Sequence, residues 1–144
     1  MTPWATSPTA LTPLGNAWKT YYNELRQPIA AVDPLGRTNS WTYDALGNKL
    51  SETRPDNTTT SFGYDSMNRL LATTNALSQV VRYGYDVLGN LIQLVDTKGN
   101  TNQWAYGLLG HRLSKTYADS TQDRYAYDAV GNLAYFTNAA SEVQ

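Results

Sequence analysis

The fold of this chain is decided by one stretch of its sequence, YGYDVLGNLI at residues 83–92, because the same pattern recurs every 21 residues. The period is carried by a tyrosine that stands at equally spaced positions: Tyr22, Tyr43, Tyr64, Tyr85, Tyr106 and Tyr127. A fixed period of this length is typical of repeat proteins, in which each unit buries its apolar surface only against its neighbours. The chain is therefore an array of one supersecondary unit.

The residues before each tyrosine predict a β-strand. Two positions before it stands a second aromatic ring in most copies: Trp41, Phe62, Tyr83, Trp104 and Tyr125. Residues i and i+2 of a strand lie on the same face. Each copy therefore places two rings side by side on one face, with a small residue such as Gly84 or Ala105 on the other.

The residues after each tyrosine predict a turn. Aspartate follows in four copies, and glycine comes three residues later in most: Asp44, Asp65, Asp86, Asp128 and Gly47, Gly89, Gly110, Gly131. A short carboxylate accepts a hydrogen bond from the backbone two residues on, and glycine takes the positive φ of such a turn. A second turn signal, DPLG at residues 33–36 in its clearest form, recurs between these turns. The unit is thus a β-hairpin, and the array is an antiparallel meander of about twelve short strands.

Composition excludes several classes of protein. The net charge is −1 and the basic residues are scattered, so nucleic acid is not an expected partner. No apolar run is long enough to span a bilayer. The chain has no cysteine, which excludes disulfides and thiolate metal sites. We predict no cofactor and no metal site.

The stretches WTYDALGNKL at residues 41–50 and YGYDVLGNLI at residues 83–92 resemble RHS repeats, also called YD repeats. The resemblance covers about residues 11 to 140. In that family the repeats form a β-sheet that spirals into a hollow shell around a C-terminal toxin or other cargo domain of the same polypeptide. Bacterial members are secreted or delivered to rival cells, and the animal teneurins are cell-surface adhesion proteins. The resemblance implies a secreted or cell-surface bacterial protein whose partners are further RHS repeats and that cargo.

The predicted organisation is an all-β array of antiparallel hairpins, forming a curled open sheet that is a segment of a β-shell. We place about six repeats at residues 11–144, the last one truncated, after a flexible lead-in at residues 1–10 that is rich in Pro, Thr and Ser. Residues 141–144 align with the start of another aromatic strand, and no polar terminal unit is present. We therefore expect self-association through open sheet edges.

Three copies depart from the pattern, and we expect irregular turns there. Gly107 replaces aspartate in the fifth copy, Asn68 replaces glycine in the third, and the copy at Tyr22 keeps little beyond its tyrosine and Leu25. His111, the only histidine, stands at a turn position that asparagine occupies in other copies. We interpret it as a surface turn residue.

The repeated aspartates suggest two chemical roles, paired carboxylates for hydrolysis or a calcium ladder. One carboxylate per turn is too few for a calcium loop, and turn capping explains identical positions in successive hairpins. We predict no catalytic residue and no enzyme. Stacking of sugar rings on the aromatic rows is the alternative to plain sheet packing. Its candidate residues are Trp4, Trp18, Trp41 and Trp104.

The sequence thus predicts a non-enzymatic structural module, part of an RHS-repeat shell that encloses a toxin or effector in a protein used in interbacterial competition or at the cell surface. The alternative is an autonomous adhesion or carbohydrate-binding module that presents its aromatic rows to cell-wall glycan.

Overall fold

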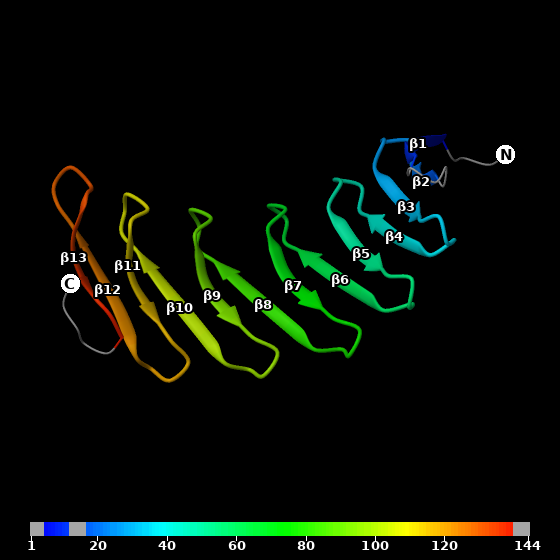
Figure 1. Ribbon diagram of the computed structural model, residues 1–144. Coiled ribbons are helices and arrows are strands. Elements are labelled where there is room, and N and C mark those ends of the chain that lie inside the picture. Colours follow the sequence, from blue (N-terminus) through cyan, green and yellow to red (C-terminus); the bar gives the residue numbers. More distant parts are fainter. Residues whose placement is uncertain (1–4, 12–16, 140–144) are drawn as a thin grey trace. The chain divides into compact units, whose positions relative to one another are not determined.

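The computed structural model describes residues 5–11 and 17–139 and contains thirteen β-strands and no helix in them (Figure 1). The strands are β1 (Ala5–Leu11), β2 (Ala17–Tyr22), β3 (Pro28–Val32), β4 (Thr38–Tyr43), β5 (Lys49–Thr53), β6 (Thr59–Tyr64), β7 (Leu70–Thr74), β8 (Val80–Tyr85), β9 (Leu91–Val95), β10 (Thr101–Tyr106), β11 (Arg112–Thr116), β12 (Gln122–Tyr127) and β13 (Leu133–Thr137). The predicted all-β hairpin array is confirmed. From β2 to β13, each strand begins 21 residues before its equivalent in the next repeat.

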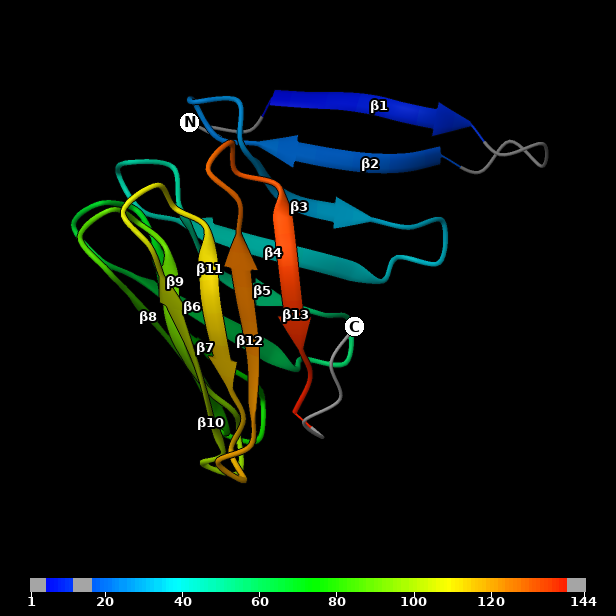
Figure 2. The ribbon, with the colours of Figure 1, turned by 90° about the vertical axis from the view of Figure 1, so that its left-hand side faces the viewer.

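The chain divides into two compact units, residues 1–79 and 80–144. In the first unit, β1 to β7 pair antiparallel, each with the next strand of the chain. In the second unit, β8 to β13 pair in the same way, and Figure 2 shows β11, β12 and β13 side by side. Each unit is thus a meander, as expected where short turns join antiparallel neighbours.

Each hairpin that carries the repeated tyrosine has a one-residue bulge after its turn. In the hairpin of β4 and β5, Tyr43 is opposite Lys49 whereas Thr42 is opposite Ser51, so Leu50 is the extra residue. The shift recurs at Tyr64. Bulges bend the strand and increase its twist. The repetition of this bulge means that every such hairpin twists in the same way.

The flexible lead-in predicted at residues 1–10 is a strand over most of its length. Residues 5–11 form β1, which pairs with β2 with a register shift between Pro8 and Ala10. In the described part of the chain β1 pairs on one side only, and proline is tolerated on such an edge strand because its missing N–H breaks no ladder there. The Pro and Thr content suggested a linker because composition reflects only the local conformational preference of the chain. The strand forms because the edge of β2 offers hydrogen-bond partners to the backbone of residues 5–11.

The strands of each unit present two chemically different faces. The aromatic face carries the paired rings of the repeat, which are half-buried, and the residues opposite them on neighbouring strands. The polar face carries the residues between the rings and their cross-strand partners, mostly Ser, Thr, Gln and small residues. Hydroxyl pairs link strands on it, with 2.6 Å between Thr42 Oγ1 and Ser51 Oγ, and 2.9 Å between Thr53 Oγ1 and Thr59 Oγ1.

Neither face covers a hydrophobic core. Among the described residues no apolar side chain is fully buried, and the buried residues are two aspartates, Asp33 and Asp123, each 8% exposed. Stability must therefore come from the backbone ladders, the turns and cross-strand side-chain pairs, which contribute roughly 0.2–1 kcal/mol each. The half-buried aromatic face leaves apolar surface available for a further layer.

Candidate functional site

The turns from β2 to β13 share one backbone design. In each five-residue turn the first N–H donates to the fifth carbonyl, and the fourth N–H donates back to the first carbonyl. In the turn of residues 86–90 these bonds measure 3.0 and 3.1 Å. The fourth residue always has a positive φ, from 60° at Arg26 and Ser78 to 91° at Gly47. The two turn signals of the sequence are therefore the same structure.

An Asp or Asn side chain at the first position caps most of these turns. In the turn of residues 86–90, Asp86 Oδ1 accepts from the backbone N–H of Leu88 and of Asn90, both at 2.9 Å, and Asp86 Oδ2 accepts from Asn90 Nδ2 at 2.9 Å. The same double cap on the third and fifth N–H is made by Asp33, Asp44, Asp65, Asn75, Asp96 and Asp128. These side-chain oxygens are thus committed to the backbone of their own turns.

The caps also perturb the acidity of the aspartates. The hydrogen bond from the Asn90 side chain, with those from the backbone of Asn90 and Leu88, lowers the pKa of Asp86 below its usual value of 3.8. The pKa of Asp44 is lowered by the equivalent bonds from Asn48 and Leu46. Hydrogen bonds to the ionised carboxylate favour that form. Carboxylates held ionised in this way suit turn capping and do not supply the proton of a general acid.

Two turns use a cap that the sequence analysis missed. Arg54 and Tyr117 stand at the first position, and the third residue takes over the capping role. Asp56 Oδ1 accepts from Thr58 N at 2.9 Å and from Thr58 Oγ1 at 2.6 Å, and Asp119 makes the same pair of bonds to Thr121. The signal in the sequence is an Asp-x-Thr step in place of the earlier aspartate.

The expectation of irregular turns is wrong. The turn of residues 107–111 keeps both backbone bonds, each at 2.9 Å, although its first residue is Gly107. Asn68 donates to Asp65 O at 3.0 Å with a φ of 62°, and the turn that begins at Asn23 is equally regular. The backbone geometry does not depend on the side chain at the first position, because turns that begin with Asn23, Arg54 or Gly107 make the same two backbone bonds. It does not require glycine at the fourth position either, because Arg26, Asn68 and Ser78 also adopt the positive φ.

The uncapped turn has a ring contact instead. His111 stacks on Tyr127, with 4.6 Å between ring centroids and 28° between their planes. His111 is half-buried in this contact, and Leu108 and Leu109 of the same turn are 98% and 85% exposed. His111 therefore lies in a turn, as the sequence analysis expected, but packs on the neighbouring repeat.

Tyrosine hydroxyls of the aromatic face donate hydrogen bonds to backbone carbonyls of other strands. Tyr64 Oη donates to Lys49 O at 3.1 Å, and Tyr127 Oη donates to Arg112 O at 3.0 Å, each across 15 residues of sequence. Cations cover several rings on this face, with the guanidinium of Arg112 4.5 Å from the ring centre of Tyr125. The repeat rings are thus engaged in contacts within the sheet.

The glycan candidates of the sequence lie in different environments. Trp41 and Trp104 are half-buried in the aromatic face, whereas Trp18 lies in β2 and is 41% exposed. Trp4 lies outside the described residues. The structure therefore does not bring the four tryptophans together.

One buried polar group escaped the sequence analysis. Asp123 lies on the aromatic face, where Tyr117 Oη donates to its Oδ2 at 2.8 Å and Tyr125 Oη approaches it at 3.4 Å. Lys115 is its cross-strand neighbour. The two phenols satisfy the carboxylate, and buried polar groups in folded proteins are generally satisfied in this way.

The described residues contain no cluster of three or more His, Cys, Asp or Glu side chains that could hold a metal ion. These residues form no helix that is long and apolar enough to cross a membrane.

Comparison with known proteins identifies the repeat. The RHS repeat family model matches residues 22–59, 43–79 and 64–101, which together cover more than half of the chain. The chain belongs to the RHS repeat family. A comparison with curated protein sequences gives no match.

Solved structures that share this fold include TcdB2-TccC3 complexes and a Tc holotoxin pore. The crystal structure of TcdB2-TccC3-Cdc42 matches with a TM-score of 0.67 and 19% identity, over 98% of this chain and 9% of that one. The Photorhabdus luminescens Tc holotoxin pore matches with a TM-score of 0.59 and 18% identity, over 88% of this chain and 9% of that one. TcdB2-TccC3 gives 0.58 and 19%, over 88% and 10%. The TM-scores establish a shared fold, and this chain spans about a tenth of the length of those chains.

Proposed function

We propose that this chain is a non-enzymatic segment of an RHS-repeat shell that encloses a toxin or effector domain of the same polypeptide, in a secreted bacterial protein. The observation that carries the proposal is a regular array of hairpins with no core of its own in the described residues. An array of this kind gains its stability from neighbouring repeats. The terminal strands would pair with further repeats of the polypeptide.

Two further observations support a structural role. The repeated aspartates, which offered the only support for hydrolysis, are occupied in capping their own turns. The fold matches Tc toxin structures, of which this chain covers about a tenth of the length. A wall made of many such hairpins needs no chemistry beyond that of stable turns and strands. The half-buried aromatic face would line the enclosed space.

Protection of the cargo tests this function. In the secreted polypeptide that contains this chain, we expect the cargo domain to resist proteinase K while the wall is intact. Tyr43→Ala combined with Tyr64→Ala removes two half-buried rings of the aromatic face and should expose the cargo to cleavage. Ser61→Ala, on the exposed polar face of the same unit, is the matched control and should leave protection unchanged. Cleavage of the cargo at the same rate in all three proteins would contradict enclosure.

A further inference from the structure

The polar face of the second unit departs from the repeat at its last hairpin. Tyr135 of β13 occupies a position that holds small or neutral polar residues in every earlier copy: Ala30, Ser51, Ala72, Gln93 and Ser114. Tyr135 is 54% exposed. The sheet structure common to all copies does not require a ring at this position, because the other copies form the same hairpin without one. The large exposed ring of Tyr135 therefore needs a separate explanation.

Arg124 lies beside this position on the same face. On β12 it is opposite Ser114 of β11 and Thr137 of β13, while the neighbouring pair is Ala126 with Tyr135. In an antiparallel pair, directly opposite side chains lie within about 5.5 Å of each other at Cβ. The strand register thus gathers a guanidinium, two hydroxyls and an exposed ring on one surface.

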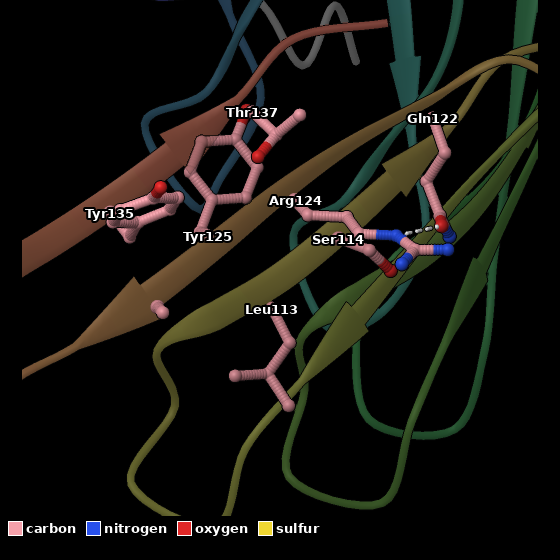
Figure 3. Close-up of a pocket in the computed structure, with 8 residues that line it drawn as sticks. Leu113, Ser114, Gln122, Arg124, Tyr125, Tyr135 and Thr137 are labelled. Carbon is pink, nitrogen blue, oxygen red and sulfur yellow. Dashed lines mark hydrogen bonds between the residues drawn. The ribbon is translucent and has the colours of Figure 1, made fainter. Parts of the chain in front are cut away.

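The guanidinium of Arg124 is held in place through one of its nitrogens. Arg124 Nε donates to Gln122 Oε1 at 2.8 Å (Figure 3). Gln122 Nε2 donates in turn to Thr116 Oγ1 at 3.1 Å. This bond uses the inner nitrogen only. In the described residues no hydrogen bond or ion pair engages the terminal amino groups of Arg124. A planar guanidinium with free terminal N–H groups is suited to bind a carboxylate with two parallel hydrogen bonds.

Among the described residues of the second unit, the polar face provides no carboxylate for this cation. In the second unit, the described aspartates lie in the turns, apart from Asp123, whose side chain lies on the opposite, aromatic face. The strand positions of the polar face carry Arg82 and Arg124. This face is therefore positively charged and complements an anionic ligand.

The side chains border an open cavity of about 480 Å³, to which Ser114, Gln122, Arg124, Tyr135 and Thr137 all contribute (Figure 3). The cavity is shallow because it lies on one layer of sheet. It therefore suits a short stretch of a flat ligand that remains partly in solvent.

We propose that the polar face of the second unit binds an acidic oligosaccharide, with the carboxylate of one sugar on Arg124, whose guanidinium is turned toward Gln122, and the ring of a neighbouring sugar on Tyr135. A pyranose has an apolar ring face for the tyrosine and hydroxyls that Ser114 and Thr137 can bond. An acidic peptide side chain would use the guanidinium and leave the ring and the hydroxyls without a role. This site is separate from the tryptophans that the sequence suggested for glycan binding, and it does not depend on the shell function.

A titration of the full chain with trigalacturonate tests the site. Binding is followed by NMR shifts of the Arg124 Nε–H signal and of the backbone amides of β12 and β13. We expect Arg124→Gln to weaken binding by about tenfold or more, since it removes a charge-assisted hydrogen-bond pair. Arg124→Lys keeps the charge but cannot donate two parallel hydrogen bonds from one planar group, so it should also weaken binding. Tyr135→Ser restores the residue of the preceding repeat and should weaken binding, whereas Tyr135→Phe should retain it.

The earlier hairpin of the same unit provides the matched control. Arg82 occupies the position equivalent to Arg124, but Gln93 stands where Tyr135 stands. Arg82→Gln removes the same charge from the same face and should leave trigalacturonate binding within about twofold of wild type. Circular dichroism shows whether each variant folds. Absence of trigalacturonate binding, equal loss in Arg82→Gln and Arg124→Gln, or equally tight binding of a poly-glutamate peptide that also depends on Tyr135 would each overturn the proposal.

Discussion

The turns of residues 86–90 and 107–111 occupy equivalent places in consecutive repeats of the second unit but are stabilised differently. Asp86 caps the first turn by accepting two hydrogen bonds from backbone N–H groups and one from the side-chain amide of Asn90. In the second, Gly107 has no side chain, and no cap appears among the described hydrogen bonds. Both turns nevertheless make the same two backbone bonds, at 3.0 and 3.1 Å in the first and 2.9 Å in the second. The cap therefore adds stability to a backbone shape that the strands and the positive φ of the fourth residue already define.

The uncapped turn of residues 107–111 depends more on side-chain packing than the capped turn of residues 86–90 does. His111 stacks on Tyr127, and the imidazole Nε2 lies 3.2 Å from the place where a Cβ would stand at Gly131. A small residue at that position therefore makes room for the ring. The weak turn of one repeat is supported by the turn and the tyrosine of the next.

The largest effect should come from removing that support. Tyr127→Ala loses the ring on which His111 stacks and the hydrogen bond to Arg112 O. We expect the free energy of unfolding to fall by about 2–3 kcal/mol, below the value for a fully buried ring because Tyr127 is half-buried. Urea denaturation measures it. Tyr127→Phe keeps the ring and should lose about 1 kcal/mol; equal losses in the two variants would show that stacking contributes nothing.

Acid should weaken the turns that aspartate caps and spare the uncapped turn of residues 107–111. The pKa of Asp86, like that of the other capping aspartates, is lowered in the folded chain, so the folded state holds its protons less tightly than the unfolded state. The stability from these caps is present above the ordinary aspartate value of 3.8 and is lost as the pH falls below it towards the lowered folded values.

The variant Asp86→Asn isolates one capped turn. Asn75 caps its turn through Oδ1 with bonds of 3.0 Å, so asparagine can replace aspartate as a cap without a titrating group. Thermal midpoints measured between about pH 5 and about pH 3 should fall less in this variant than in wild type. An identical decline in both proteins would mean that the Asp86 cap is not coupled to folding.

The smallest effect should come from adding a cap to the uncapped turn. A Cβ at Gly107 would meet Leu113 at 3.7 Å and His111 O at 3.8 Å, which are ordinary contacts. Gly107→Asp should therefore accept hydrogen bonds from the backbone N–H groups of Leu109 and His111, as Asp86 does from Leu88 and Asn90, and raise the thermal midpoint by about 1–3 °C. Gly107→Ala separates the loss of backbone freedom from the cap itself. If alanine stabilises as much as aspartate does, the cap has no effect of its own in this turn.

The local features of the fold could be predicted from the sequence because they depend on residues close together in the chain. The aromatic-x-Tyr step predicts a strand, the Asp and Gly spacing predicts a turn, and their 21-residue period predicts the hairpin array. The turns at Asn68 and Gly107 were predicted less well. Their backbone is regular because the paired strands on either side of each turn fix its ends. A comparison of side chains between repeats does not reveal this constraint.

The repeat, the strand length and the capping aspartates are readable from the amino-acid sequence, since each depends on interactions within a few residues. The side chains that meet across strands are known only from the folded sheet. Register places Arg124 between Ser114 and Thr137, sets Tyr135 on the polar face, and brings Tyr117 to Asp123. It also makes a strand of residues 5–11. These outcomes depend on the register in which neighbouring strands pair. A bulge shifts that register by one residue, and such a shift moves a side chain to the other face of the sheet.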